Sequence, residues 1–168
     1  MTGGTKIISG SGTITNLGTL TFSNPGMSVP FNVVNHGQIT FSEETMLPSL
    51  ASYGKVAILK NVTVLNEFKA RSSSVLEGPG VLSCSGCKQA EISGIIGTKL
   101  SLDNTVIYSN ATFNNSFSFY QSTLKGVLNF TKESVLLLKK CALEDASVVS
   151  EGNITFSQGA TMKTHHFT

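Results

Sequence analysis

The sequence predicts an all-β fold, a single right-handed parallel β-helix or β-solenoid of about seven irregular coils. Three observations predict it. The 168-residue chain has 16 glycines and only 13% charged residues, a composition typical of strands joined by many turns. One six-residue phrase recurs along the chain. Almost every segment is interrupted by Gly, Asn or Ser before a helix could reach about ten residues.

The recurring phrase begins with glycine and ends in an alternating apolar pattern. It is clearest in GTLTFS from Gly18, GQITFS from Gly37, GVLNFT from Gly126 and GNITFS from Gly152, with looser matches from Gly54, Gly80 and Gly97. The intervals between these glycines average about 22 residues, which is in the range of repeat proteins. A phrase repeated in register predicts coils that bury one another's inner face. A β-sandwich, the alternative all-β fold, requires no such recurrence.

Each phrase predicts which side chains face inward. Alternate residues of a strand share a face, so the apolar second and fourth residues after glycine should line the core. These pairs are Leu20 and Phe22, Ile39 and Phe41, Val56 and Ile58, Leu82 and Cys84, Leu128 and Phe130, and Ile154 and Phe156. The residues between them are small or polar and should face outward. At Gly97 the apolar pair shifts by one, to Leu100 and Leu102, which indicates a β-bulge or a misaligned coil.

Domain organisation follows from the same repeat. We expect residues 1–168 to form one domain. An end coil without a capping helix exposes unpaired backbone and apolar side chains, and neither terminus shows an amphipathic helix. We therefore expect a fragment of a longer chain, or end-to-end self-association between copies. The longer intervals after Gly54, Gly97 and Gly126 predict protruding loops.

Charge and hydropathy argue against two classes of partner. The chain has 12 basic and 10 acidic residues, and Arg71 is its single arginine. Because arginine supplies most bidentate contacts to bases and phosphates, nucleic acid is not an expected partner. No window approaches the roughly 18 apolar residues of a membrane helix, so no membrane insertion is expected either.

The three cysteines leave several interpretations open. Cys84 and Cys87 form one CxxC, which is compatible with a metal half-site, a redox pair or a local disulfide. A zinc site would need two more ligands, and no histidine has suitable spacing. The favoured interpretation places Cys84, Cys87 and Cys141 at small apolar positions of strands. No metal and no cofactor is expected.

The glycine phrase, with turn sequences such as EGPG (Glu77–Gly80) and NxG (Asn16–Gly18), resembles the parallel β-helix passengers and adhesins of secreted and cell-surface proteins. One such family, the chlamydial polymorphic outer-membrane proteins, is built on FxxN and GGA[ILV] tetrapeptides, and neither occurs in this chain. The resemblance implies a non-catalytic scaffold for adhesion or surface recognition, located outside the cell or on its surface. Its implied partners are a host or partner surface protein or a glycan, and it implies no functional residue.

An aromatic segment, FNNSFSFY, supplies the candidate binding residues Phe113, Phe117, Phe119 and Tyr120. The three phenylalanines share one parity, so a strand places them on one face, with Tyr120 on the other. Inside the coil they would stack in the core. Outside it they would form an apolar contact surface for sugar rings or for a partner.

N-glycosylation sequons provide candidate modification sites at Asn61, Asn110, Asn114, Asn129 and Asn153. Asn129 and Asn153 occupy outward positions of the phrase, where a glycan would be accessible. The alternative is that these asparagines simply belong to a solvent-facing polar row.

Two further functions are weighed against the scaffold. A polysaccharide lyase or glycoside hydrolase on a β-helix needs clustered carboxylates, and Glu133, Glu144 and Glu151 are the candidate cluster. Ice binding would need a flat threonine array. Thr13, Thr15, Thr19 and Thr21 begin such an array, but it does not continue along the chain, and the preference of threonine for strands explains it. The expected function is therefore non-catalytic.

Overall fold

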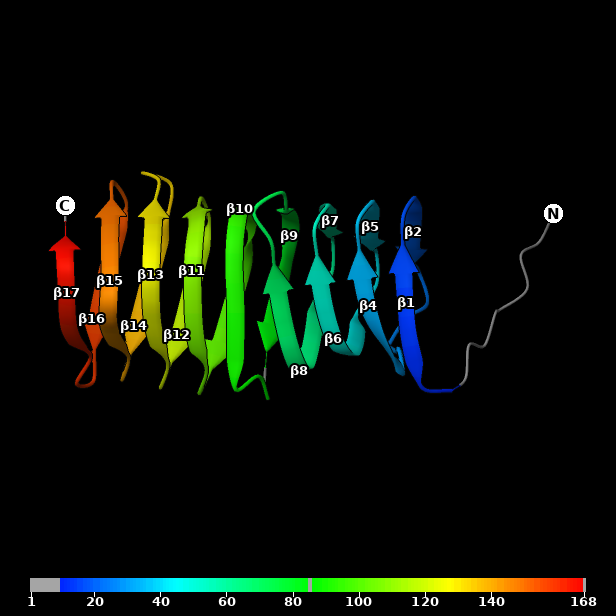
Figure 1. Cartoon of the computed structure of the whole chain (residues 1–168), viewed down its shortest axis with the longest axis horizontal. Coiled ribbons are helices and arrows are strands. Elements are labelled where there is room, and N and C mark those ends of the chain that lie inside the picture. The colour runs from blue at the N-terminus through cyan, green and yellow to red at the C-terminus, as the bar shows by residue number, and fades with distance from the viewer. Residues whose placement is uncertain (1–9, 85, 168) are drawn as a thin grey trace.

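The computed structural model describes residues 10–84 and 86–167. Figure 1 shows a single elongated row of strands, with no helix among these residues. The strands are β1 (Gly12–Asn16), β2 (Thr19–Phe22), β3 (Met27–Ser28), β4 (Phe31–Asn35), β5 (Gln38–Phe41), β6 (Thr45–Ser52), β7 (Lys55–Ile58), β8 (Val62–Ala70), β9 (Val75–Cys84), β10 (Gln89–Asp103), β11 (Val106–Phe113), β12 (Ser116–Tyr120), β13 (Thr123–Phe130), β14 (Val135–Lys139), β15 (Ala142–Ser150), β16 (Asn153–Ser157) and β17 (Thr161–Phe167).

The strands form a parallel solenoid with three faces. Face A holds β1, β4, the second halves of β6 and β8, and the first parts of β10, β11, β13, β15 and β17. Face B holds β2, β5, β7, the first half of β9, the middle of β10, and the second halves of β11, β13 and β15. Face C holds β3, the first halves of β6 and β8, the ends of β9 and β10, and β12, β14 and β16. All these pairings are parallel, which confirms the predicted β-solenoid.

The chain makes about eight turns. In Figure 1 the front strands run upward, the chain returns downward behind them, and successive coils advance from right to left. This sense of rotation along the direction of advance makes the coil right-handed. One inward position of face A runs through Ile14, Val33, Leu50, Phe68, Ala90, Ile107, Leu124, Leu143 and Met162. Each turn therefore takes 17 to 22 residues, so the turns are on average shorter than the expected 22 residues, and about eight of them take the place of the expected seven.

The miscount has a simple cause, because the glycine phrase occurs on two faces. Gly18, Gly37, Gly54 and Gly126 lead into face B, whereas Gly80, Gly97 and Gly152 lead into face C. Intervals between phrases on different faces mix whole turns with parts of a turn. The phrase marks a strand with one side inward, and a coil contains three such strands.

The predicted inward pairs form the core. All of these residues are buried except three in the end coils: Leu20 and Ile154 are partly buried, and Phe156 is exposed. The phrase at Gly97 fits as well, since the register shifts between Gly97 and Lys99 and brings Leu100 and Leu102 into the core.

The predicted protruding loops are wrong. The long intervals after Gly54, Gly97 and Gly126 contain the further strands of the same coils, such as β8, β11 and β14.

Buried polar side chains close two of the corners. At the corner between faces A and B, Asn16 Nδ2 donates to Asn35 Oδ1 (2.8 Å), and Asn35 Nδ2 donates to Ser52 Oγ (3.3 Å) and to the Lys55 carbonyl oxygen (3.0 Å). At the corner between faces C and A, buried Thr105 and Ser122 bond to backbone carbonyls. These bonds satisfy backbone groups that the strands leave unpaired as the chain changes direction.

Candidate recognition surface

The aromatic segment divides between the core and the surface. Phe113, Phe117 and Phe119 are all buried, and the Phe113 ring lies 4.9 Å from the Phe117 ring and 4.9 Å from the Phe130 ring. Their packing places them inside the coil, and their candidate role in binding is therefore wrong. Strand parity is the reason, because all three occupy inward columns of the solenoid.

Of the four candidate binding residues, Tyr120 is the one that reaches the surface. It is the last residue of β12, at the corner where face C turns into face A, and it pairs in register with Lys139 of β14. The Lys139 Nζ lies 5.5 Å and the Lys140 Nζ 5.6 Å from the centre of the tyrosine ring, within the range of a cation–π contact. Lys140 Nζ also lies 3.4 Å from the Tyr120 hydroxyl oxygen. We call these three residues the Tyr120 corner.

Backbone geometry explains why Lys140 points outward. Lys140 has φ 55°, and the corresponding residues of neighbouring coils, Gln121 and Gln158, have φ 48° and 54°. This left-handed conformation turns the chain by a sharp angle in one residue. The residues that follow the corner, Ser122 after Gln121 and Cys141 after Lys140, are buried, whereas Gln121 and Lys140 themselves are exposed.

Face C presents three outward columns of side chains. Its middle column is rich in hydroxyl groups and reads Met46, Thr63, Ser83, Ser101, Ser118, Leu137 and Thr155. Neighbouring strands of a sheet lie roughly 4.8 Å apart, so this column repeats at a fixed spacing along the axis. The outward column at the edge of face C that borders face A holds Asp103, Tyr120, Lys139 and Ser157, so it contains two residues of the Tyr120 corner.

Charges on the other faces are largely paired. On face A, Lys69 Nζ lies 2.6 Å from a Glu67 carboxylate oxygen and 3.7 Å from one of Glu91, and Arg71 also pairs with Glu91. The hydrogen bond from Lys69 to Glu67 raises the pKa of Lys69 above its ordinary value. Further along face A, Lys125 pairs with Glu144 (3.5 Å).

Face B and its turn into face C hold the remaining ion pairs that the structure describes. Lys55 and Glu77 lie 2.7 Å apart on face B, and Lys132 and Glu133 lie 4.0 Å apart in the turn. In the described part of the chain, no ion pair lies on the strands of face C.

A shallow groove of about 320 Å³ lies near the N-terminal end of face C, between the short β3 and the first halves of β6 and β8. Its lining mixes polar and apolar groups: Gly26, Met27, Ser28, Glu44, Thr45, Met46, Asn61 and Thr63. The groove exists because β3 has only two residues and covers little of the next coil. It lies on strands of the first turns, whereas the Tyr120 corner belongs to β12 and β14.

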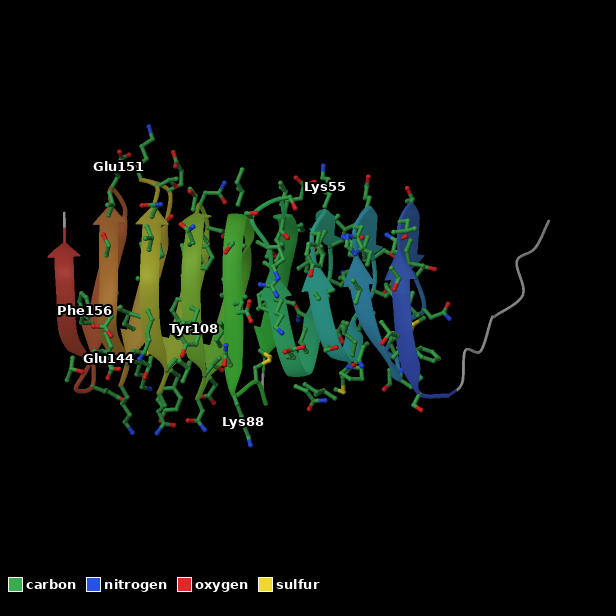
Figure 2. All side chains as sticks on the ribbon, viewed as in Figure 1. Lys55, Lys88, Tyr108, Glu144, Glu151 and Phe156 are labelled. Atoms are coloured by element: carbon green, nitrogen blue, oxygen red, sulfur yellow. A yellow bond between two sulfur atoms is a disulfide. The ribbon has the colours of Figure 1, made fainter. Side chains whose placement is uncertain are left out.

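The three candidate catalytic carboxylates are not brought together. Glu144 lies on face A and pairs with Lys125, whereas Glu133 and Glu151 lie in successive turns between faces B and C. Figure 2 shows Glu144 and Glu151 near opposite edges of the molecule. The four threonines proposed as an array also separate, with Thr13 and Thr15 on β1 and Thr19 and Thr21 on β2.

The cysteines take two forms. Cys84 and Cys87 form a disulfide between β9 and β10, so the local disulfide is the correct interpretation of the CxxC. The favoured interpretation, in which both were small apolar residues of strands, was wrong for this pair, and Cys87 lies outside the strands. Cys141 is a free, buried thiol whose Sγ lies 3.0 Å from the Phe119 carbonyl oxygen. Burial raises the pKa of the Cys141 thiol above its ordinary value.

The sequon asparagines are accessible. Asn61, Asn110, Asn114 and Asn153 are exposed, and Asn129 is partly exposed. Asn61 lines the groove, and its Oδ1 accepts a hydrogen bond from the Val81 backbone N–H (3.2 Å).

Sequence reasoning missed the lysines that surround Tyr120. The signal was the pair Lys139–Lys140 directly after an apolar run, but its position next to Tyr120 depends on the length of one coil.

Among the described residues, no group of three or more His, Cys, Asp or Glu side chains could hold a metal ion, and no helix has the length and apolarity to cross a membrane. Comparisons of the chain with protein-family models, curated proteins and solved structures found no match.

Proposed function

We propose that the chain is a non-catalytic β-solenoid module of an extracellular or cell-surface protein, of the passenger or adhesin type, that acts as a rigid scaffold for adhesion or surface recognition. The observation that carries the proposal is the combination of one continuous core with an outward lattice on face C. Stacked strands keep the outward side chains at a fixed spacing, and such pre-organisation lowers the entropic cost of binding.

Two features support a location outside the cell. Disulfides persist in oxidising compartments, and Cys84 and Cys87 form one in the structure. Asparagines in sequons lie at accessible positions on face B, in the turns from face B to face C and at the start of β16 on face C, where a glycan would not disturb the core. Both features fit a secreted or surface-displayed module.

A carbohydrate-active enzyme is the alternative. It would need two carboxylates roughly 5 to 10 Å apart on either side of the scissile bond. Glu144 lies on face A, so the cluster of three carboxylates does not assemble. Glu133 and Glu151 lie in successive turns between faces B and C and are the pair that this alternative would use.

The test is a glycan-array screen of the purified protein, followed by mass spectrometry of every bound polysaccharide after incubation. Binding with unchanged polysaccharide mass is expected. Shortened products would contradict the non-catalytic proposal and would direct attention to the carboxylates. Binding to a surface protein but to no glycan would retain the scaffold and replace its partner.

We also propose that copies associate end to end. The inward residues of the last coil are incompletely covered, and stacking the first coil of a second copy on them would continue the parallel sheet. Sedimentation velocity over a dilution series should show a weight-average size that rises with concentration. Phe156→Asp should suppress that rise. A compact monomer at all concentrations would contradict the association and leave the scaffold proposal intact.

A further inference from the structure

The Tyr120 corner brings two lysines that form no ion pair among the described residues to one tyrosine ring. Lys139 and Lys140 are adjacent in the chain and both ammonium groups lie within 5.6 Å of the centre of one tyrosine ring. Neither takes part in an ion pair among the described residues, whereas Lys55, Lys69, Lys125 and the single arginine all do. Two cations held close together without an anion repel each other, so a bound anion would relieve that repulsion.

The nearest acidic residue in the same column does not neutralise the pair. Asp103 is in register with Tyr120, one strand before it, and Lys139 is one strand after it. Asp103 forms no ion pair with Lys139 or Lys140, since none of the described ion pairs joins its carboxylate to either ammonium group.

The surroundings of the corner match the chemistry of a sugar. The outward neighbours of Tyr120 are Asp103, in register on the preceding coil, Ser118 on the same strand and the exposed Gln121 at the turn, with Ser101 diagonal to it beside Ser118. Their hydroxyl and amide groups both donate and accept hydrogen bonds, as sugar hydroxyls do. The tyrosine supplies an apolar ring and a polar hydroxyl in one side chain.

We propose that the Tyr120 corner binds an acidic saccharide, with the carboxylate or sulfate group of the sugar held by Lys139 and Lys140 and the ring seated beside Tyr120. A sugar acid is favoured over nucleic acid because the single arginine, Arg71, is engaged by Glu91 on face A and cannot supply bidentate phosphate contacts here. Beside the corner, Ser118, Ser101, Ser83 and Thr63 form a column of hydroxyl groups along the axis, which suits a linear polymer. This inference rests on the proposed recognition function.

The test compares three fluorescently labelled polymers of similar length and single-stranded DNA. Polygalacturonate carries carboxylates, dextran sulfate carries sulfates, and dextran carries no charge. Binding of one or both acidic polysaccharides is expected, with weak or no binding of dextran. The preferred acidic polymer identifies the anionic group. DNA binding as tight as that of the acidic polysaccharides would overturn the assignment to a sugar.

Variants locate the site. Lys139→Gln combined with Lys140→Gln should weaken binding by at least about tenfold, because hydrogen bonds to charged groups typically contribute that much. Glutamine suits the corner, since Gln121 and Gln158 adopt the same backbone conformation there. Tyr120→Phe should weaken binding less, because it removes the hydroxyl and keeps the ring.

The matched control is Lys60→Gln combined with Lys132→Gln, which removes the same charge from exposed residues of the turns between faces B and C. It should change affinity less than about twofold, as expected for distant surface residues. An equal loss in both double variants would overturn the corner site in favour of general charge attraction. If neither acidic polymer binds, the corner proposal fails, while binding of neutral glycans or of a protein would still support the scaffold function.

Discussion

The middle and end coils of the solenoid contain the same kind of residue in very different surroundings. Phe119 and Phe156 occupy the same inward column of face C, yet Phe119 is 0% exposed and Phe156 is 38% exposed. On face A, Leu143 is 3% exposed and the next residue of its column, Met162, is 45% exposed. The inward position alone does not bury a side chain, because a neighbouring coil must cover it from each side.

The largest expected loss of stability comes from truncating a buried aromatic side chain in a middle coil. Phe119→Ala should lower the free energy of unfolding by about 3–5 kcal/mol, since it leaves a cavity that the flanking coils cannot fill. Phe156→Ala should cost only about 1 kcal/mol, because its side chain already contacts water. Urea denaturation followed by circular dichroism measures both. Equal losses would show that the end coil is covered in solution.

Glycines distinguish the two regions by a second mechanism. A Cβ at Gly54 would overlap the carbonyl oxygen of Gly37 in the preceding coil, whereas a Cβ at Gly18 meets nothing within 4 Å. Gly54→Ala should destabilise the protein by about 1–3 kcal/mol, as overpacking does. Gly18→Ala should change stability by less than about 0.5 kcal/mol. Thermal unfolding of the two variants provides the comparison, and a neutral Gly54→Ala would contradict the close stacking of these turns.

Asn16 and Asn35, at the corner between faces A and B, should differ less in their effects on stability. Asn35 is completely buried and bonds to both neighbouring coils, whereas Asn16 belongs to the first described coil. Asn35→Ala removes partners from buried groups on either side and should cost about 1–3 kcal/mol. Asn16→Ala should cost less, because water can replace part of what it loses. A larger effect at Asn16 in the same denaturation assay would contradict this order.

The smallest effect concerns Cys141, which lies directly under the last turn, where its carbonyl oxygen accepts from Thr161 N–H (2.8 Å). Burial raises the pKa of the Cys141 thiol in the folded protein above its ordinary value of 9.0. The stability that comes from burying the neutral thiol is therefore fully present below pH 9. Above pH 9 the unfolded chain releases the proton first, and that stability is progressively lost. Cys141→Ala should therefore show a weaker loss of stability than the parent between pH 8 and pH 10. Identical pH profiles would contradict the burial of the thiol.

Local alternation predicted the fold well because it is a property of each strand. The inward pairs at Gly18, Gly37 and Gly54, and even the shifted pair Leu100 and Leu102, follow from the two-residue period of a strand. The number of coils did not follow, because the same phrase begins strands on two faces. Only the pairing register shows that Gly54 and Gly80 belong to different sides.

The candidate site was less predictable because it depends on what lies one coil away. The alternation of side chains along a strand correctly placed Tyr120 on the opposite face from Phe113, Phe117 and Phe119. It did not decide which of the two faces pointed into the core. The contact between Tyr120 and Lys140 joins residues 20 apart, so it needs the exact length of that coil. The disulfide, in contrast, joins residues three apart and was among the alternatives that the CxxC allowed.

Amide hydrogen exchange, resolved along the chain by mass spectrometry, tests most directly whether neighbouring coils create the core. The strongest protection is expected in the middle strands, such as β8, β10 and β11, with protection falling towards β1 and β17 because these lack a partner on one side in the described chain. Protection that is uniform to both ends, or that peaks at an end, would contradict the account.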